Sequence, residues 1–170
     1  MSIDISKVTT KGGDHGQTSL SCGTRVPKDH PRVLFMGQLD SLNCLLGTLR
    51  TYLDECSKSN QEILKHPQVL IQIQNDIFDL GAYYSFEQKS SYQSQFGPER
   101  TLQLEMWMAD WIPTLPPLKS FVLPGGHIAN ALAHQIRSRS REIESWAISH
   151  KELLQLQDPT LAYLNRTSDF

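Results

Sequence analysis

Two arginines, Arg137 and Arg141, stand four residues apart in a segment whose apolar spacing predicts a helix over about residues 127–149. Residues four apart lie on one face of a helix, one turn from each other. Two guanidinium groups in that arrangement can hold polyphosphate oxygens through bidentate, charge-assisted hydrogen bonds. The other interpretation is a solvated basic face paired with Glu142 and Glu144, and the spacing alone leaves both open. We expect Arg139 to lie elsewhere on the surface.

The segment before residue 31 is rich in glycine and hydroxyl-bearing residues, and we expect a loop there. Gly12, Gly13 and Gly16 free consecutive backbone N–H groups, which can form a concave anion-binding site. Lys11 and Lys28 can add positive charge. Hydroxyl donors come from Thr10, Thr18 and Ser19. The spacing is not that of a P-loop, because no lysine follows a glycine at the required distance. The other interpretation is an N-terminal segment without fixed structure.

Asp40 interrupts the apolar spacing of a helix that we expect to begin near Val33. A buried carboxylate without a partner is costly, so a buried Asp40 would need an arginine from another helix or another subunit. In the other interpretation Asp40 lies exposed at the edge of the apolar stripe.

Apolar residues recur at three- and four-residue steps through most of the chain after residue 31, the pattern of amphipathic helices. We predict helices that begin near residues 33, 63, 98, 127 and 160, and the second of them contains the polar pair Asn75–Asp76 and ends near Gly81. We predict a polar loop over 88–98, and the prolines of 113–124 exclude a helix interior there. No convincing strand alternation is present. The pattern therefore predicts an all-α bundle behind a flexible N-terminal arm.

The composition is that of an ordinary soluble globular domain, with 39% hydrophobic and 20% charged residues among 170. A net charge of −2 gives no general attraction to nucleic acid or to anionic membranes, so a phosphate ligand would need locally placed basic groups. Three cysteines without C-x-x-C spacing argue against disulfides and structural zinc, and we expect Cys44, in an apolar run, to be buried. No secretory or membrane-spanning segment is evident, so the expected location is the cytoplasm, or the mitochondrial matrix if a transit peptide has been removed.

Taken in their order along the chain, the glycine-rich arm, the helix with Asp40 and the arginine helix resemble the PduO-type ATP:cob(I)alamin adenosyltransferases. The resemblance covers nearly the whole chain. The family motif T-[KR]-T-G-D-x-G-x-T-[ST] is matched by residues 10–19, and G-x-R-V-x-K-D by 23–29. The motif V-D-E-L-N-S-L-L-G is matched by 39–47, and I-Q-N-D-L-F-D-L-G-A by 73–82. The motifs F-[IV]-L-P-G-G and Y-L-N-R-x-S-D are matched by 121–126 and 163–169.

The resemblance implies a five-helix bundle with a four-helix core, assembled as a homotrimer with one active site at each subunit interface. Residues 1–31 would form an ATP-binding arm, and residues 32–170 the bundle of the same single domain. The implied reaction transfers the 5′-deoxyadenosyl group of ATP to Co(I) of a reduced corrinoid, cob(I)alamin or a relative, and releases triphosphate. Mg²⁺ would be held mainly by ATP, without dedicated protein ligands. A Co(II) reductase and a cobalamin-dependent acceptor enzyme are implied partners, while nucleic acid and membranes are not.

The resemblance also assigns roles to single residues. Asp40 would pair with Arg137 across the interface, and Phe121 would lie against the corrin and displace the lower nitrogen ligand of cobalt. The implied ATP contacts are Thr10, Lys11, Gly12, Gly13, Thr18, Ser19 and Lys28 from the arm, and Arg137, Arg141, Glu144 and Asn165 from the neighbouring subunit. This chemistry needs no histidine, so we expect His127 and His134 to be structural or on the surface.

The chain departs from the family pattern in its basic helix, where R-x-x-x-R-R-x-E-R has become a run with Glu142 and Ser145 at two of the basic positions. An anion near a triphosphate reverses the sign of the interaction. If Glu142 faces the triphosphate, a non-catalytic member that binds ATP or corrinoid as a carrier or regulator is favoured. If Glu142 faces solvent or pairs with Arg139, the interpretation as an active enzyme is retained.

Further departures lie at both ends of the chain. Gly12 replaces a threonine of the arm, which removes a hydroxyl donor and adds flexibility, and Ser41 replaces a glutamate. The sequence stops five residues after Asn165, where relatives continue their last helix. A short terminal helix is expected to fray, which would weaken the contact of Asn165.

Overall fold

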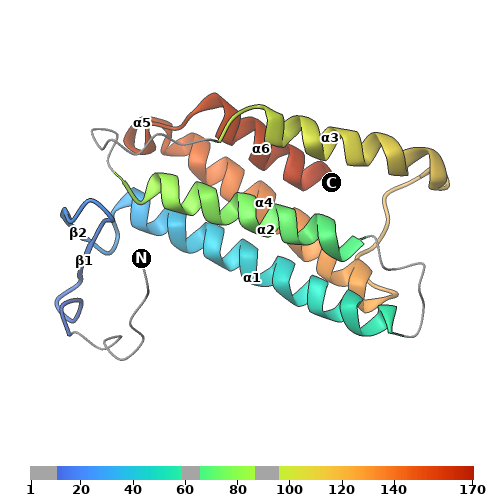
Figure 1. Ribbon diagram of the computed structural model, residues 1–170, viewed down its shortest axis with the longest axis horizontal. Helices are drawn as coiled ribbons and strands as arrows, with labels where there is room; N and C mark the ends of the chain where they lie inside the picture. The colour runs from blue at the N-terminus through green and yellow to red at the C-terminus, as the bar shows by residue number, and fades with distance from the viewer. Residues whose placement is uncertain (1–10, 59–65, 87–95) are drawn as a thin grey trace.

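The computed structural model describes residues 11–58, 66–86 and 96–170, and these form a bundle of five long helices with a small hairpin at one end (Figure 1). A one-turn helix and a 3₁₀ turn complete it. The elements are β1 (Gln17–Ser19), β2 (Arg25–Pro27), α1 (Pro31–Ser57), α2 (His66–Tyr84), α3 (Glu99–Trp111), η3 (Ile112–Thr114), α4 (Ile128–Ser149), α5 (Lys151–Leu154) and α6 (Asp158–Asp169). The predicted all-α bundle is confirmed.

Two histidines define where long helices begin. The side chain of His30 accepts a hydrogen bond from the backbone N–H of Arg32 at 3.2 Å, so α1 starts with a side-chain cap and with Pro31 in its first turn. His127 caps α4 in the same way, accepting from Ala129 N–H at 3.3 Å. His127 therefore has a structural role, as expected from the sequence.

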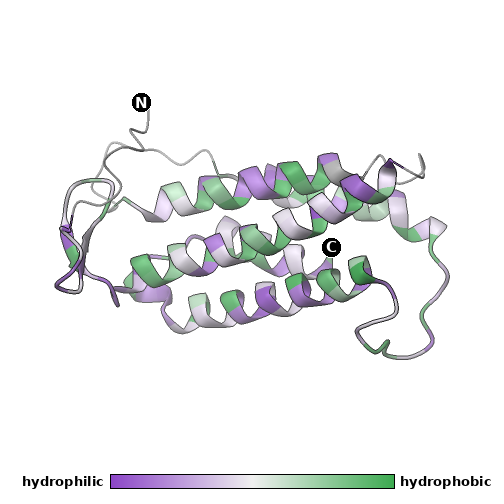
Figure 2. Cartoon of the chain, turned by 90° about the horizontal axis from the view of Figure 1, so that it is seen from below, coloured by the Kyte–Doolittle hydropathy of each residue, from purple (hydrophilic) through white to green (hydrophobic). Residues whose placement is uncertain are grey.

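The core runs along the centre of the bundle, where α1 packs against α2 and α4, and α6 packs against α4 and α3. Phe35 of α1 meets the ring of Tyr84 edge-on at 5.0 Å and stacks on Trp146 at 6.2 Å. Figure 2 shows hydrophobic and hydrophilic residues interleaved along the helices, as amphipathic packing requires. None of the helices in the described ranges is both long and apolar enough to cross a membrane.

Two predictions about single segments are wrong. The arm contains a strand pair, because β1 and β2 pair antiparallel with Thr18 opposite Val26. Strands of three residues are too short to show a recognisable alternation. Cys44 is exposed rather than buried, because it lies about 200° around α1 from Leu42 and from Leu46, which both face the core. Most of the predicted loop 88–98 lies outside the described residues.

The last helix is packed to its end, and the prediction that it frays is wrong. Thr167 and Ser168 in its final turn are buried. Phe170 lies against two indole rings of α3, with centroid distances of 6.1 Å to Trp107 and 5.1 Å to Trp111. These contacts bury apolar area that stabilises the terminal turn.

Candidate active site

The arm is a hairpin whose base is fixed to the end of α2. Leu20 and Val26 are buried at this base. The backbone N–H of Ser21 donates to the carbonyl of Ser85 at 2.9 Å, and the two serine hydroxyl oxygens lie 2.7 Å apart. Figure 1 shows the hairpin beyond the end of the bundle at which α1 begins.

The tip of the arm is a tight turn that starts at Lys11. Lys11 has a φ of 56°, an uncommon conformation for a residue with a side chain, and its carbonyl accepts from Asp14 N–H at 3.3 Å. Gly16 N–H donates to the carbonyl of Gly13 at 3.3 Å, and Lys28 N–H donates to that of Gly16 at 2.8 Å. From Lys11 onward, where the structure describes it, the arm therefore has a folded shape, unlike the structureless segment that the sequence left open.

Lys28 lies directly over Gly13. A Cβ at Gly13 would come 3.2 Å from the Lys28 ammonium nitrogen, so the absence of a side chain lets the charge approach the arm backbone. The structure thus brings Lys28 together with Gly13, two of the residues implied in ATP binding. Thr18 is half-buried and Ser19 exposed on β1. Thr10 lies outside the described residues.

Arg137 and Arg141 project from one side of α4 into solvent, and within the described residues neither makes an ion pair. Glu144, three residues after Arg141, lies close to the same face. Its carboxylate accepts a hydrogen bond from the side-chain amide of Asn165 on α6 at 3.0 Å. The helix spacing therefore places Glu144 beside the two arginines, and the hydrogen bond brings Asn165 to Glu144.

The acidic departure from the family motif is neutralised within α4. Arg139 donates to Glu142 at 2.7 Å, and the two are three residues apart on the helix. Arg139 is half-buried rather than fully on the surface, and Ser145 is exposed. Glu142 therefore pairs with Arg139, the arrangement that is compatible with an active enzyme.

A cavity of about 270 Å³ lies at the edge of the arginine face. Its floor is apolar and comes from α1 and α2, while α4 and the end of α6 form its sides. Arg137 and half-buried His134 are part of the lining, and Nδ1 of His134 is buried without a hydrogen-bond partner among the described residues. Further lining residues are Leu46, Leu49, Leu70, Ile73, Asn130, Ala133, Ile136, Thr167, Ser168, Asp169 and Phe170.

Asp40 and Phe121 are both exposed. Within the part of the single chain that the structure describes, Asp40 has no ion pair, so no arginine of another helix of the same chain partners it. A partner from another subunit stays a prediction. The side chain of Phe121 is completely solvent-accessible, as are most of Leu118 and Leu123 around it. Large exposed apolar patches mark binding surfaces.

The loop that carries Phe121 is fixed where it joins α4. Gly125 and Gly126 have φ values of 147° and 79°, which favour glycine. The side-chain amide of Asn130 donates to the carbonyl of Gly125 at 2.8 Å. His127 approaches Tyr52 of α1, with 3.4 Å between its Nε2 and the phenol oxygen.

A buried polar cluster explains Asp76, the second residue of the unusual Asn75–Asp76 pair, whereas Asn75 is exposed. Asp76 of α2 is 2% exposed, forms an ion pair with Arg100 of α3 and accepts a hydrogen bond from the Tyr163 hydroxyl of α6 at 2.9 Å. Burial, followed by the charge of Asp76, raises the pKa of Tyr163 well above 10.0. The cluster joins three helices, so its role is structural.

Arg25 is a residue of the site that the sequence did not single out. Its guanidinium donates to the carbonyl oxygen of Gly12 at 2.7 Å and to the hydroxyl of Ser19 at 3.3 Å. Its position inside the G-x-R-V-x-K-D motif is the one feature of the sequence that marks it.

Comparison with known proteins agrees with this arrangement. Residues 8–170 match the family model described as cobalamin adenosyltransferase. A cobalamin adenosyltransferase of Cupriavidus metallidurans is 34% identical over 165 residues, which are 97% of this chain and 84% of the relative. A corrinoid adenosyltransferase of Mycobacterium leprae is 33% identical over 177 residues, covering 99% of this chain and 89% of the relative.

Solved structures are similar over the same span. A variant of the PduO-type ATP:corrinoid adenosyltransferase from Lactobacillus reuteri, complexed with cobalamin and ATP, has a TM-score of 0.85 and 27% identity, covering 96% of this chain and 88% of that one. Another variant of the same enzyme, complexed with ATP, has a TM-score of 0.82 and 26% identity, with coverages of 95% and 88%. On its sequence and on its fold alike, this chain belongs to the cobalamin adenosyltransferase family.

Proposed function

We propose that this protein transfers the 5′-deoxyadenosyl group of ATP to Co(I) of a reduced corrinoid such as cob(I)alamin, and releases triphosphate. The observation that carries the proposal is the pair Arg137 and Arg141, exposed on one face of α4 with no carboxylate partner in the described residues. Two guanidinium groups that are not engaged in ion pairs are suited to a polyanionic ligand. The similar enzyme from Lactobacillus reuteri, complexed with cobalamin and ATP, supports the identity of both substrates.

The proposed roles follow from the charge that develops in the reaction. Co(I) donates an electron pair to the ribose C5′ of ATP, a Co–C bond forms, and the C5′–O bond breaks with its electrons going to triphosphate. No proton is transferred, so no general base is needed. Lys28, Arg137 and Arg141 stabilise the leaving group electrostatically. Holding the two reactants in line can contribute about 7–11 kcal/mol in favourable cases.

Phe121 is proposed to contact the corrin face from which the lower nitrogen ligand leaves. Its complete exposure in the middle of the loop 115–127 makes it available to a ligand without disturbing the core. An apolar ring there offers cobalt no ligand, so the metal stays four-coordinate, and its reduction from Co(II) becomes easier.

Mg²⁺ is proposed to arrive with the nucleotide. Among the described residues, no group of three or more histidine, cysteine or acidic side chains is placed to hold a metal ion. The proposal gives the ion no step of its own in the reaction.

The proposed assembly is a homotrimer in which the arm of one subunit meets the arginine face of the next. In one protomer, the arm is fixed to Ser85, beside the start of α1. The cavity that Arg137 lines also contacts Leu46, which lies about 22 Å along α1 from Pro31. Within one protomer the arm and the arginine face are therefore far apart. Their separation supports a site built between subunits. Asp40 and Arg137, both exposed and without a partner in the described residues, would then pair across the interface.

The activity is tested with ATP, Mg²⁺ and chemically reduced cobalamin, followed by the absorbance of the product. Formation of light-sensitive adenosylcobalamin supports an adenosyltransferase. Measurable ATP binding without product would instead identify a carrier or regulator.

The shared site is tested by mixing two inactive variants, one changed in the arm (Lys28→Ala) and one on α4 (Arg137→Ala). If each site uses two subunits, randomly mixed trimers regain about a quarter of the wild-type activity, because one interface in four joins two intact halves. If each site lies within one subunit, the mixture stays as inactive as its components. Sedimentation of both variants checks that they still assemble.

A further inference from the structure

Arg25 connects two parts of the arm that are apart in sequence. It lies on β2 directly opposite Ser19 of β1. One end of its guanidinium, Nη1, donates to the Ser19 hydroxyl at 3.3 Å, and the other end, Nη2, donates to the Gly12 carbonyl at 2.7 Å. Both residues are among the proposed ATP contacts: Gly12 lies in the segment 10–13, and Ser19 lies in the segment 18–19.

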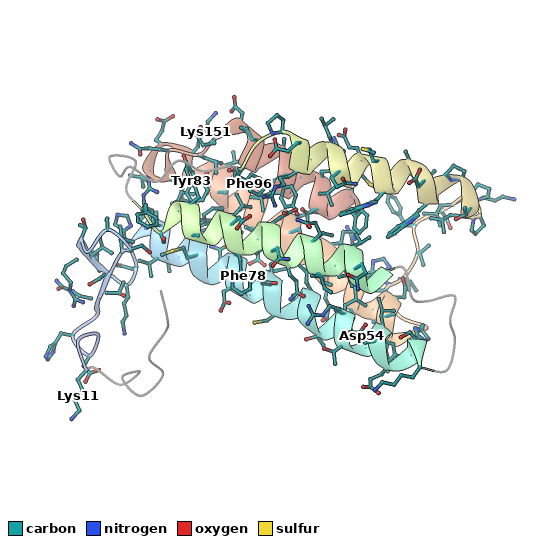
Figure 3. The ribbon with its side chains drawn as sticks, in the orientation of Figure 1. Lys11, Asp54, Phe78, Tyr83, Phe96 and Lys151 are labelled. Carbon is teal, nitrogen blue, oxygen red and sulfur yellow. The ribbon has the colours of Figure 1, made fainter. Side chains whose placement is uncertain are left out.

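The arm needs such a connection at its tip rather than at its base. The base is fixed by burial of Leu20 and Val26 and by the hydrogen bond from Ser21 to Ser85. Figure 3 shows Lys11 at the far end of the arm, away from the helices. At this end Gly12 is exposed and has no side chain to pack, so the bond from Arg25 to its carbonyl restrains it.

The fork of a guanidinium group matters for this connection. Its planar N–H groups point in fixed, diverging directions and can bond two separate oxygens at once, whereas an ammonium group is a point charge on a flexible stem. Within the described residues Arg25 makes no ion pair, so both of these hydrogen bonds go to neutral oxygens. Its charge is therefore not neutralised, and it adds to that of Lys28 in the arm.

We infer that Arg25 is a positioning residue for the nucleotide: it fixes Gly12 relative to Ser19, so that both segments have the required separation before ATP binds. The inference rests on the proposed function and deepens it. A loop that is already in its bound conformation loses less entropy on binding, and its affinity is higher for that reason. Arg25 acts through the arm backbone and does not contact the reacting atoms.

The test compares wild type with Arg25→Lys and Arg25→Gln, and uses Arg50→Lys as the matched control. Arg50 is on α1 and donates to the side chain of Gln74 at 2.8 Å, so the control loses a similar hydrogen bond far from the arm. Calorimetry gives the Kd of ATP, steady-state kinetics give KM and kcat, and hydrogen exchange of the unliganded protein reports on a peptide covering 12–19.

We expect both Arg25 variants to bind ATP about tenfold more weakly, which corresponds to about 1.4 kcal/mol. KM for ATP rises by the same factor, while kcat at saturating ATP and the thermal midpoint stay as in wild type. Amides of 12–19 exchange faster in both variants. In Arg50→Lys none of these quantities changes.

Each other outcome overturns the inference in a distinguishable way. Retained affinity in Arg25→Lys together with loss in Arg25→Gln would mean that the charge acts directly on the phosphates. A fall in kcat with unchanged KM would place Arg25 in the chemistry. If hydrogen exchange of the 12–19 amides is unchanged in Arg25→Lys, the arm does not need the two diverging hydrogen bonds of a guanidinium group. A wild-type chain that binds no ATP would overturn the proposed function as well.

Discussion

Arg139 and Glu142 form an ion pair within α4, with 2.7 Å between Nη1 and Oε2. At about 100° per residue, Glu142 lies about 140° around the helix from Arg137. The carboxylate that departs from the family's basic motif is thus held away from Arg137 and is already paired. Arg137 and Arg141 make no ion pair in the described residues, so both guanidinium groups remain available to a triphosphate.

Removing the charge of Glu142 should have little effect. We expect Glu142→Gln to change kcat and KM for ATP by less than about twofold, and the free energy of unfolding by less than about 1 kcal/mol, because the pair is at the surface. Steady-state kinetics and urea unfolding measure these quantities. A tenfold gain in kcat/KM would show that Glu142 opposes the triphosphate after all.

Truncation of Arg137 should abolish most of the activity and leave the protomer folded. We expect Arg137→Ala to lower kcat by about 10²–10³-fold, the usual effect of removing a group that stabilises transition-state charge. The variant should also assemble more weakly, because Asp40 would lose its proposed partner. Activity and sedimentation are measured at the same protein concentration, with Arg139→Ala as the control. Wild-type turnover in Arg137→Ala would remove this residue from the site.

The cluster around Asp76 should contribute to stability rather than to catalysis. Asp76→Ala removes the buried carboxylate that Arg100 and Tyr163 share, and leaves Arg100 its more exposed partner Asp79. Because a buried ion pair and a buried hydrogen bond are lost together, we expect a loss of about 3 kcal/mol in the free energy of unfolding. Tyr163→Phe removes one hydrogen bond to Asp76 and should cost about 1–3 kcal/mol, because it leaves an acceptor less well satisfied. Denaturant unfolding measures both, and a stability loss in Asp76→Ala no larger than in Tyr163→Phe would contradict the buried ion pair.

Tyr163 should make stability fall at alkaline pH. Its pKa is raised in the folded state above the ordinary 10.0, so the unfolded chain releases the proton first. Its contribution is complete below pH 10 and decreases as the pH rises from there towards the folded pKa. The free energy of unfolding, measured in steps from pH 8 upwards, should decline less steeply above 10 in Tyr163→Phe than in wild type. Parallel curves would contradict the raised pKa.

Phe121→Ala should separate reduction from transfer. Because the ring is fully exposed, we expect unchanged unfolding and unchanged ATP binding. Turnover that starts from Co(II) should fall by about tenfold or more, or 1.4 kcal/mol of barrier, and should fall less when Co(I) is supplied directly. Assays from the two oxidation states measure the difference. Equal losses in both would mean that Phe121 does not act by removing the lower ligand.

The sequence determined those features that depend on neighbours within one or two helical turns. Apolar spacing located the long helices, and the four-residue step placed Arg137 and Arg141 on one face. Glycine content located the arm tip, where Gly13 does admit the Lys28 ammonium. The order of the motifs led to the family, because they match in type and spacing along nearly the whole chain.

Only the tertiary structure decided which polar groups have partners. Asp76 is satisfied by Tyr163, 87 residues away, and Arg25 bonds to Gly12 across the hairpin. Spacing did not reveal that Asp40 and Cys44 are exposed, because burial depends on which neighbouring helix covers a face. Local periodicity fixes the direction of a side chain relative to its own helix, but its partners are fixed only when distant segments pack together.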